Sequence, residues 1–353
     1  MKRIITNAFL LFGSIGFATG LSEIVVRWGF PQPVNGPHFK VLTSGLKVNR
    51  DAGVSLYETT GKAVFYHFYP FHLRDTPQNP SATPVLVLGD SYTFGWGLQA
   101  EETYLHLLQK RIDQAWKRPP NRPQLLNAGT GGWGTGDELA YLETFGDRIK
   151  PRAVVVFISN DDIGRAYRNQ IYRPKSGSTN VLERRQLPVP AMRWLTENNA
   201  AYDWAVQHSH LARLFRNAVL NRTLKRPQPY QLSKAELQEA VLLGQALFLR
   251  MQDWCARRGI PLLLLTTGYH DPQVQDGNPT KTFMATAPDF FQKHRFTFYD
   301  ISAASWEARK AKPSDWVFPD LHPNVRGAEQ IATLSWPVLQ QFLIRHLPPV
   351  VVP

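Results

Sequence analysis

The chain has 353 residues, of which 43% are hydrophobic and 12% aromatic, enough for one large or two ordinary folded domains. This composition excludes a disordered protein, and the single cysteine, Cys255, excludes an intramolecular disulfide framework. The net charge of +12 suits an anionic surface, polymer or lipid headgroup. The basic residues are scattered and form no helix-turn-helix or RNA-binding signature, so we expect no nucleic-acid partner.

The N-terminus has the layout of an export signal. Lys2 and Arg3 precede a largely apolar run over residues 4–21. Small residues at positions 18–20 offer a cleavage site, but apolar residues resume at 24–26, which favours an uncleaved anchor. With its basic end inside, such an anchor predicts a single span in a bacterial inner membrane and a domain outside the cytoplasm. Cleavage would instead give a secreted protein.

The rest of the chain divides by composition. We expect three parts: a signal anchor at residues 1–30, a stalk and irregular lead-in at 31–83, and a main domain at 84–346. Residues 31–83 are rich in Pro, Gly and polar residues. Residues 165–232 carry many Arg and Asn, and a structureless stretch of that length is unusual, so a mainly helical insertion is expected there.

The main domain alternates short apolar runs with helical patterns. Strands are predicted at residues 85–88, 124–127, 153–158, 260–265 and 296–301. Helices are predicted at residues 101–116, 137–149 with Asp137 as N-cap, 233–258 opened by the capping box Ser233–Glu236, 283–291 and 327–346. Continuous apolar strands with intervening helices predict an α/β fold, a three-layer doubly wound parallel sheet.

A serine follows the first predicted strand where Gly89 and Asp90 break it. Ser91 therefore lies where open α/β sheets place their ligands, and near a helix N-terminus. The plain alternative is that Ser91 caps the helix and Gly89 serves a tight turn. A serine nucleophile needs an imidazole base and a group that orients it. His322 and Asp320, just before the last helix, supply both.

Acyl transfer also needs hydrogen-bond donors for an oxyanion. Gly132, in the glycine-dense loop at residues 128–136, presents an N–H without an obstructing side chain. Asn160, after the third strand, adds a side-chain amide, and the backbone N–H of Ser91 completes the set.

These motifs resemble the blocks of the SGNH (GDSL-type) hydrolase superfamily, in the family's order, over roughly residues 84–345. The resemblance implies a flavodoxin-like fold, Ser91 as nucleophile, Gly132 and Asn160 as oxyanion donors, and Asp320 and His322 as the rest of a triad. Two departures leave alternatives open. Only Leu321 separates Asp320 from His322, where the family has two residues, so Asp315 is an alternative orienter. Gly131 and Gly134 are alternatives to Gly132.

The resemblance implies a membrane-anchored bacterial esterase that removes O-acetyl groups from a cell-envelope or exported glycan. Its substrate would be an acylated glycan or a small ester, with no metal or organic cofactor; no protein partner is inferred. The first alternative is an O-acetyltransferase that uses the same triad, with the insertion at residues 165–232 controlling the access of water. The second is a non-catalytic glycan-binding or assembly protein that keeps the fold.

Overall fold

A computed structural model describes residues 2–59, 62–116, 122–175, 181–223, 232–267 and 277–347. Its central feature is a parallel sheet in the order β12-β11-β8-β6-β7. The strands are β6 (Thr83–Leu88), β7 (Pro123–Asn127), β8 (Ala153–Ile158), β11 (Leu262–Thr266) and β12 (Thr297–Tyr299). In chain order this is the 2-1-3-4-5 arrangement of a doubly wound sheet, so the predicted fold class is confirmed. Its switch point lies between β6 and β8, whose C-terminal ends carry Ser91 and Asn160.

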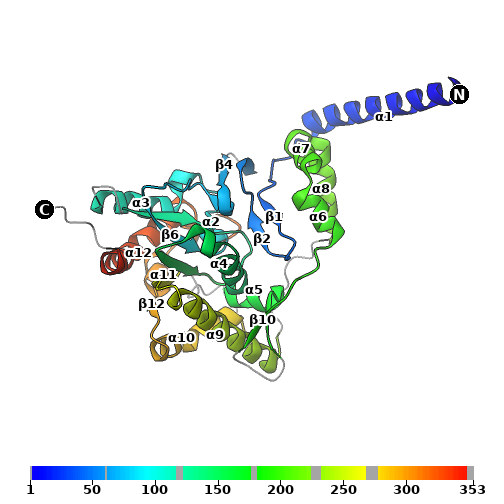
Figure 1. Cartoon of the computed structure of the whole chain (residues 1–353). Helices are drawn as coiled ribbons and strands as arrows, with labels where there is room; N and C mark the ends of the chain where they lie inside the picture. Colours follow the sequence, from blue (N-terminus) through cyan, green and yellow to red (C-terminus); the bar gives the residue numbers. More distant parts are fainter. Residues whose placement is uncertain are drawn as a thin grey trace.

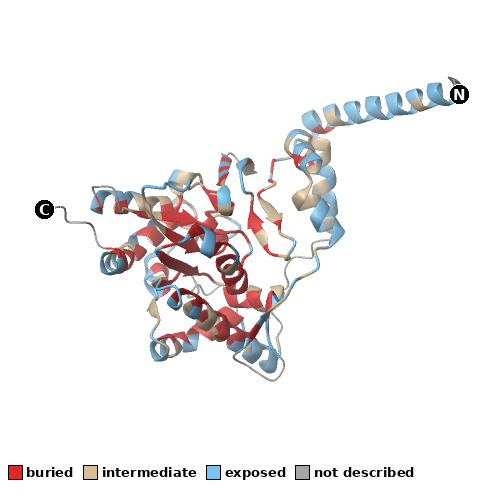
Figure 2. Cartoon of the chain, in the orientation of Figure 1, coloured by how far each residue is buried: buried red, intermediate tan, exposed pale blue. Residues whose placement is uncertain are grey.

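Helices cover both faces of the sheet and make three layers (Figure 1). One face is covered by α4 (Thr135–Ile149), α9 (Lys234–Ala256) and α10 (Pro279–Lys293), and the other by α3 (Tyr104–Ala115) and α12 (Val325–His346). Along β8, Val154 and Val156 enter the first core, whereas Val155 and Phe157 enter the second. Both faces of the strand are thus buried, which is why its sequence is a continuous apolar run. Figure 2 shows the buried sheet between its helices.

The first residues of two helices show how well local sequence signals predict where a helix begins. The capping box of α9 is present, with Ser233 and Glu236 each accepting from the other's backbone N–H. The prediction for α4 was wrong by three residues. Gly134 is the N-cap, and Asp137 lies one turn inside, where its Oδ2 accepts from the Gly134 N–H at 3.0 Å. Asp137 stabilises the same helix end, but from the N3 position.

The expected irregular lead-in contains regular structure. The hairpin of β1 (Phe39–Val41) and β2 (Lys47–Asn49) precedes an antiparallel sheet of β3 (Gly53–Thr59), β4 (Lys62–Tyr69) and β5 (Leu73–Arg74). In β4, Val64, Tyr66 and Phe68 are buried and the residues between them are exposed. A run of aromatic residues there hid the alternation of a half-buried strand.

Three helices form most of the described insertion: α6 (Ala191–Asn198), α7 (Ala200–His208) and α8 (His210–Thr223). They follow the short helix α5 (Asp162–Asn169) and the hairpin of β9 (Tyr172–Pro174) and β10 (Leu182–Arg184). Residues 176–180 and 224–231 of the predicted insertion lie outside the described residues. Asn198 joins α6 to the rest through two hydrogen bonds with the backbone of Val41, at 3.2 and 2.8 Å.

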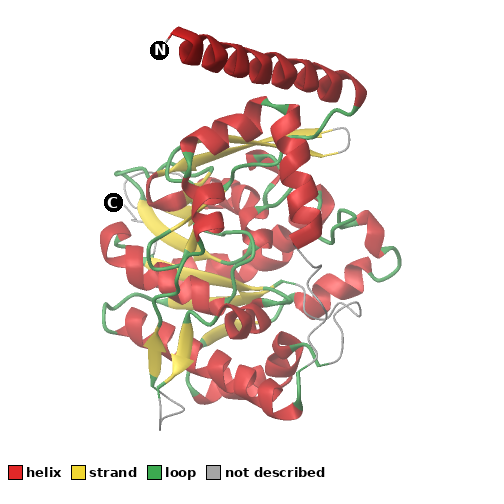
Figure 3. Ribbon diagram, turned by 90° about the vertical axis from the view of Figure 1, so that its right-hand side faces the viewer, coloured by secondary structure: helices red, strands yellow, loops and turns green. Residues whose placement is uncertain are grey.

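The N-terminal helix α1 (Lys2–Gly29) extends away from the body (Figures 1 and 3). Within its segment Arg3–Gly29, an 18-residue window has a mean hydropathy of 1.8 and is almost wholly exposed, so the helix is long and apolar enough to span a membrane. A signal sequence has the same features. At its far end, the Glu23 carboxylate accepts hydrogen bonds from Ser209 Oγ and from the N–H groups of His210 and Leu211, at 2.8 to 3.0 Å. This one carboxylate therefore caps α8 and fixes α1 to it.

Candidate active site

Ser91 begins a one-turn helix, α2 (Ser91–Phe94), directly after β6. A side chain on Gly89 would collide with Thr93, since a Cβ there would lie 2.0 Å from Thr93 Oγ1. Asp90 caps the turn, and its Oδ1 accepts from the Tyr92 N–H at 2.8 Å. The turn ends at Gly95 with a φ of 78°, a left-handed conformation that favours glycine. The glycines thus let the chain turn sharply and hold the Ser91 hydroxyl at the end of the sheet.

The imidazole of His322 meets this hydroxyl. Its Nε2 lies 2.9 Å from Ser91 Oγ, a hydrogen-bond distance. The loop that carries His322 is held in place by its own backbone, with the Phe318 N–H donating to the His322 carbonyl at 2.8 Å, and by Tyr92 Oη, which donates to the Leu321 carbonyl at 2.9 Å. Ser91 and His322 are 231 positions apart in the sequence, and the fold brings their side chains together.

Of the two carboxylates proposed to orient His322, Asp320 contacts it and Asp315 does not. Asp320 Oδ2 lies 3.1 Å from His322 Nδ1, and this contact lowers the pKa of Asp320. The distance is that of an ion pair; no aligned hydrogen bond to Nδ1 occurs among the described residues. Asp315 instead pairs with Lys312 at 3.1 Å and with Arg326 at 3.5 Å. The Asp320 side chain is 47% exposed, so solvent weakens its hold on the ring.

The glycine-rich loop distinguishes its three candidate donors. Gly134 uses its N–H in the bond to Asp137, and Gly131 packs against Phe39, whose Cζ would lie 2.9 Å from an added Cβ. Gly132 has a φ of 79° and is exposed. After β8, Asn160 Oδ1 is buried without a hydrogen-bond partner in the described part of the chain. This amide oxygen therefore makes no hydrogen bond that stabilises the fold among these residues.

The GDSL-like lipase/acylhydrolase family matches residues 87–330, about two thirds of the chain. The chain belongs to this family. It is accordingly an SGNH serine hydrolase that acts on acyl esters. No curated protein sequence matches it.

Solved structures with similar architecture include three esterases. The psychrotrophic esterase EstA from Pseudoalteromonas sp. is 15% identical, with 74% of this chain and 98% of that chain covered and a TM-score of 0.41. A catalytic mutant of the acetylxylan esterase Axe2 from Geobacillus stearothermophilus is 15% identical, with coverages of 73% and 94% and a TM-score of 0.41. A two-domain esterase active on acetylated mannans is 13% identical, with coverages of 77% and 52% and a TM-score of 0.44.

In this acylhydrolase the carboxylate of Asp90 gathers the strand-end loops around Ser91. Its Oδ2 accepts from Ser159 Oγ and from Arg165 Nη1, both at 2.8 Å. Arg165 Nη1 also donates to the carbonyl of Trp133 at 3.1 Å. Asp90, directly before Ser91, therefore joins the loops after β7 and β8 to the turn that carries the serine.

The sequence reasoning missed both ends of this connection. It interpreted Asp90 as a strand break and assigned Arg165 to the insertion. The available signal was the spacing of Asp161 and Arg165, an i, i+4 pair at the start of α5 whose side chains lie 3.1 Å apart. That pair predicts a helix on which the Arg165 side chain points toward Asp161. It does not predict the contact of Arg165 with Asp90.

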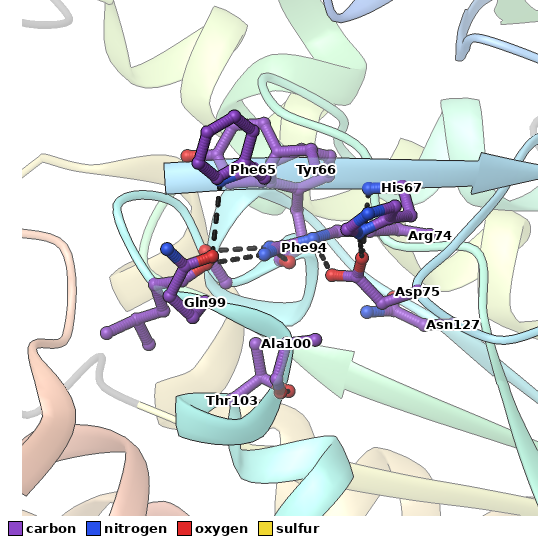
Figure 4. A network of polar contacts seen from close by, with 12 residues as sticks. Phe65, Tyr66, His67, Arg74, Asp75, Phe94, Gln99, Ala100, Thr103 and Asn127 are labelled. Atoms are coloured by element: carbon purple, nitrogen blue, oxygen red, sulfur yellow. Dashed lines mark hydrogen bonds and ion pairs between the residues drawn. The ribbon is translucent and has the colours of Figure 1, made fainter. Parts of the chain in front are cut away.

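A second network holds the other side of Ser91. The guanidinium of Arg74 is fully buried and donates to the carbonyls of Phe94, Gly95 and Leu98. Its Nε donates to Asp75 Oδ2 at 2.6 Å, as Figure 4 shows. The guanidinium carbon also lies 4.4 Å from the centroid of the Phe94 ring. One side chain of the lead-in therefore fixes the segment that follows α2.

Buried acids lie behind Asp90. The hydroxyl of Ser159 is 2.8 Å from Asp90 Oδ2 and 2.7 Å from Asp162 Oδ1. A hydroxyl has one hydrogen to donate, so one of the two carboxyl groups must carry a proton. Burial, followed by the charge of Asp90, raises the pKa of Asp162 to about 8. We therefore assign the proton to Asp162, which donates to Ser159, while Asp90 pairs with Arg165 at 2.8 Å.

Glu138 on α4 makes the stability of the fold depend on pH. It is fully buried, and neither carboxyl oxygen has a partner among the described residues. Burial, followed by the neighbouring acids Asp162 and Asp90, raises its pKa well above 4.5. The folded state thus keeps a proton that the unfolded chain releases above about pH 4.5, so the free energy of unfolding falls as pH rises from there toward the folded pKa.

Replacing Glu138 with Gln removes this titration without changing the shape of the side chain. We expect the loss of unfolding free energy between pH 5 and pH 8 to be smaller than in the wild type by about 1 kcal/mol or more. Thermal or urea unfolding at the two pH values measures it, with the exposed Glu101→Gln as the matched control. A Glu138→Gln variant with the pH dependence of the wild type would contradict the assignment.

Proposed function

We propose that this acylhydrolase removes small O-acyl groups, acetyl foremost, from a cell-envelope or exported glycan. The observation that carries the proposal is the 2.9 Å distance between Ser91 Oγ and His322 Nε2. A hydroxyl is a poor nucleophile near neutral pH, and an imidazole at this distance removes its proton as the oxygen attacks.

The reaction has two steps. Ser91 Oγ bonds to the ester carbonyl carbon as its proton passes to His322 Nε2, and the N–H groups of Ser91 and Gly132 with the Asn160 amide stabilise the oxyanion. The tetrahedral intermediate expels the sugar oxygen, which takes the proton from His322. In the second step water gives a proton to His322 and attacks the acyl group. The acid leaves, and the proton returns to Ser91 Oγ.

The surroundings of Ser91 support a short acyl group on a large substrate. Four well-formed cavities of about 230 to 890 Å³ among the described residues are lined by neither Ser91 nor His322. A long acyl chain needs a deep apolar pocket, whereas an acetyl group on a polymer does not. The rings of Tyr92 and Trp96 lie 5.7 and 6.1 Å from the His322 ring and offer apolar surface to a sugar.

The proposed location rests on α1. With Lys2 and Arg3 on the cytoplasmic side, the apolar helix would place the catalytic domain outside the cytoplasm. Exported and cell-envelope glycans would be accessible there.

The proposal is tested by following the acetyl group. The full-length protein in detergent micelles is incubated with p-nitrophenyl acetate, with and without a deacetylated xylan as acceptor, and acetate and acetylated xylan are quantified. We expect the acetate released to equal the ester consumed in both cases. Acetyl groups on the xylan would identify the protein as a transferase, and a folded protein that consumes no ester would exclude both activities.

Asp320→Asn is expected to lower kcat/KM for p-nitrophenyl acetate by about 10- to 100-fold. The neutral amide neither stabilises the imidazolium nor favours the tautomer with the proton on Nδ1, but the half-exposed Asp320 is partly replaceable by water. Steady-state kinetics measure the loss. Asp315→Asn is the matched control and should change kcat/KM less than about 2-fold, because Asp315 contacts Lys312 and Arg326 instead. The reverse order of effects would make Asp315 the orienter.

A further inference from the structure

The hairpin of β1 and β2 packs directly on the glycine-rich loop. The indole Nε1 of Trp133 donates to the carbonyl of Lys47 at 2.6 Å, and Asn49 Nδ2 donates to the carbonyl of Gly129 at 2.9 Å. Val48, between them, is fully buried in the core. Since alternate side chains of a strand share a face, Lys47 points to the same side as Asn49, toward the loop.

The ammonium group of Lys47 lies against Gly132. A Cβ built on Gly132 would meet Lys47 Nζ at 2.8 Å, and the next nearest atom is Lys47 Cε at 3.9 Å. Gly132 is the residue proposed to donate to the oxyanion, so a positive charge stands at the edge of the proposed ester site. The ammonium also lies 4.9 Å from the centroid of the Phe39 ring.

This charge has no counter-ion among the described residues, where no carboxylate oxygen lies within 4.0 Å of Lys47 Nζ. The acids that act on it from a distance are Asp137 and Glu197. Asp137 accepts from Gly134 and Asn169, and Glu197 pairs with Arg193. Burial lowers the pKa of Lys47 to about 8, so most molecules still carry the charge at pH 7.

A half-buried ammonium without a partner loses hydration and gains no ion pair in return. A ligand with a negative charge would compensate that loss. Resting on the proposed function, we propose that Lys47 binds a carboxylate of the substrate, and that the preferred substrate is an acidic glycan with a uronic-acid residue beside the acylated sugar. The position against Gly132 places this carboxylate next to the scissile ester.

The test compares acidic and neutral substrates in Lys47→Met, which keeps much of the side-chain stem and removes the charge. With O-acetylated polygalacturonate, we expect KM to rise about 10- to 100-fold, the effect of losing a hydrogen bond to a charged group. With O-acetylated xylan or p-nitrophenyl acetate, kcat and KM should change less than about 2-fold. In the wild type, added salt should raise KM for the acidic polymer, and in Lys47→Met this dependence should be much weaker.

Lys40→Met is the matched control. Lys40 lies on the partner strand of the same hairpin, but its ammonium pairs with Asp51 at 3.0 Å. Its loss should leave the preference for the acidic polymer unchanged. Thermal unfolding of both variants checks that the hairpin is intact.

Two outcomes would overturn the proposal. Equal KM values of wild type and Lys47→Met on the acidic polymer would show that Lys47 binds no substrate carboxylate. A large fall in kcat on p-nitrophenyl acetate would show that its charge acts on the oxyanion instead. If the wild type hydrolyses no ester, the proposed function fails by itself. Calorimetric binding of unacetylated polygalacturonate to wild type and Lys47→Met then tests the subsite alone, and equal affinities would reject it.

Discussion

Ser91→Ala is expected to lower kcat/KM for an acetyl ester by at least about 1,000-fold. The hydroxyl 2.9 Å from His322 Nε2 is the proposed attacking atom, and alanine leaves water as the remaining nucleophile. The oxyanion donors stay in place, so a low residual rate is expected rather than none.

The measurement is steady-state hydrolysis of p-nitrophenyl acetate by the full-length protein, together with its thermal unfolding midpoint. Ser91 is 6% exposed, and its side chain packs at the surface of the site, so removal of one oxygen should leave the fold intact. The exposed Ser81→Ala is the control and should retain full activity. A folded Ser91→Ala variant with wild-type activity would show that Ser91 is not the nucleophile.

Arg74→Met is expected to cost about 3–5 kcal/mol of the free energy of unfolding. The substitution removes a fully buried charge and leaves Asp75, whose side chain is 9% exposed, without the guanidinium on Oδ2 and with the His67 N–H on Oδ1. It also removes the guanidinium donor from the carbonyls of Phe94, Gly95 and Leu98, of which Gly95 keeps the Leu98 N–H. Because those carbonyls lie at the end of α2 and just after it, activity should fall as well, through displacement of Ser91.

Urea unfolding of the wild type and of Arg74→Met measures the loss of stability. Arg111→Met is the matched control: Arg111 is partly buried and donates to the Ala332 carbonyl at 3.2 Å and to Thr333 Oγ1 at 3.0 Å. Its loss should cost about 1 kcal/mol or less, as for other peripheral hydrogen bonds. If Arg74→Met costs no more than Arg111→Met, the network of Figure 4 does not stabilise the fold as argued.

The parts of the fold that sequence predicted are those in which one local pattern decides the structure. All six residues of β8 are buried, so its composition alone predicts a central strand. β4 was missed because exposed Phe65 has the same hydrophobic character as buried Tyr66 and Phe68, and composition cannot separate the two faces. Asp137 was misplaced by three residues because an acid is favourable both at the N-cap and within the first turn.

The candidate site divides in a similar way. Ser91 and His322 each follow a strand or loop signal, and the sheet topology that those signals predict brings the two together. Lys47 and Gly132 are 85 positions apart, and Arg74 contacts carbonyl groups that any residue would provide. Contacts of this kind leave no pattern in a single sequence, because one partner is a glycine or a backbone atom.

If α1 is a membrane anchor, the contact between Glu23 and α8 limits how freely the active site can move. A tether joined only through flexible residues would let the active site sweep a hemisphere above the membrane. Here Ser209, His210 and Leu211 hold one carboxylate of α1, so α1 and α8 are joined directly. If α1 spans a bilayer, this contact restricts the distance of Ser91 from the membrane and the direction in which the active site faces. Such an enzyme would process polymer strands that pass it at one distance from the membrane and leave strands farther out unmodified.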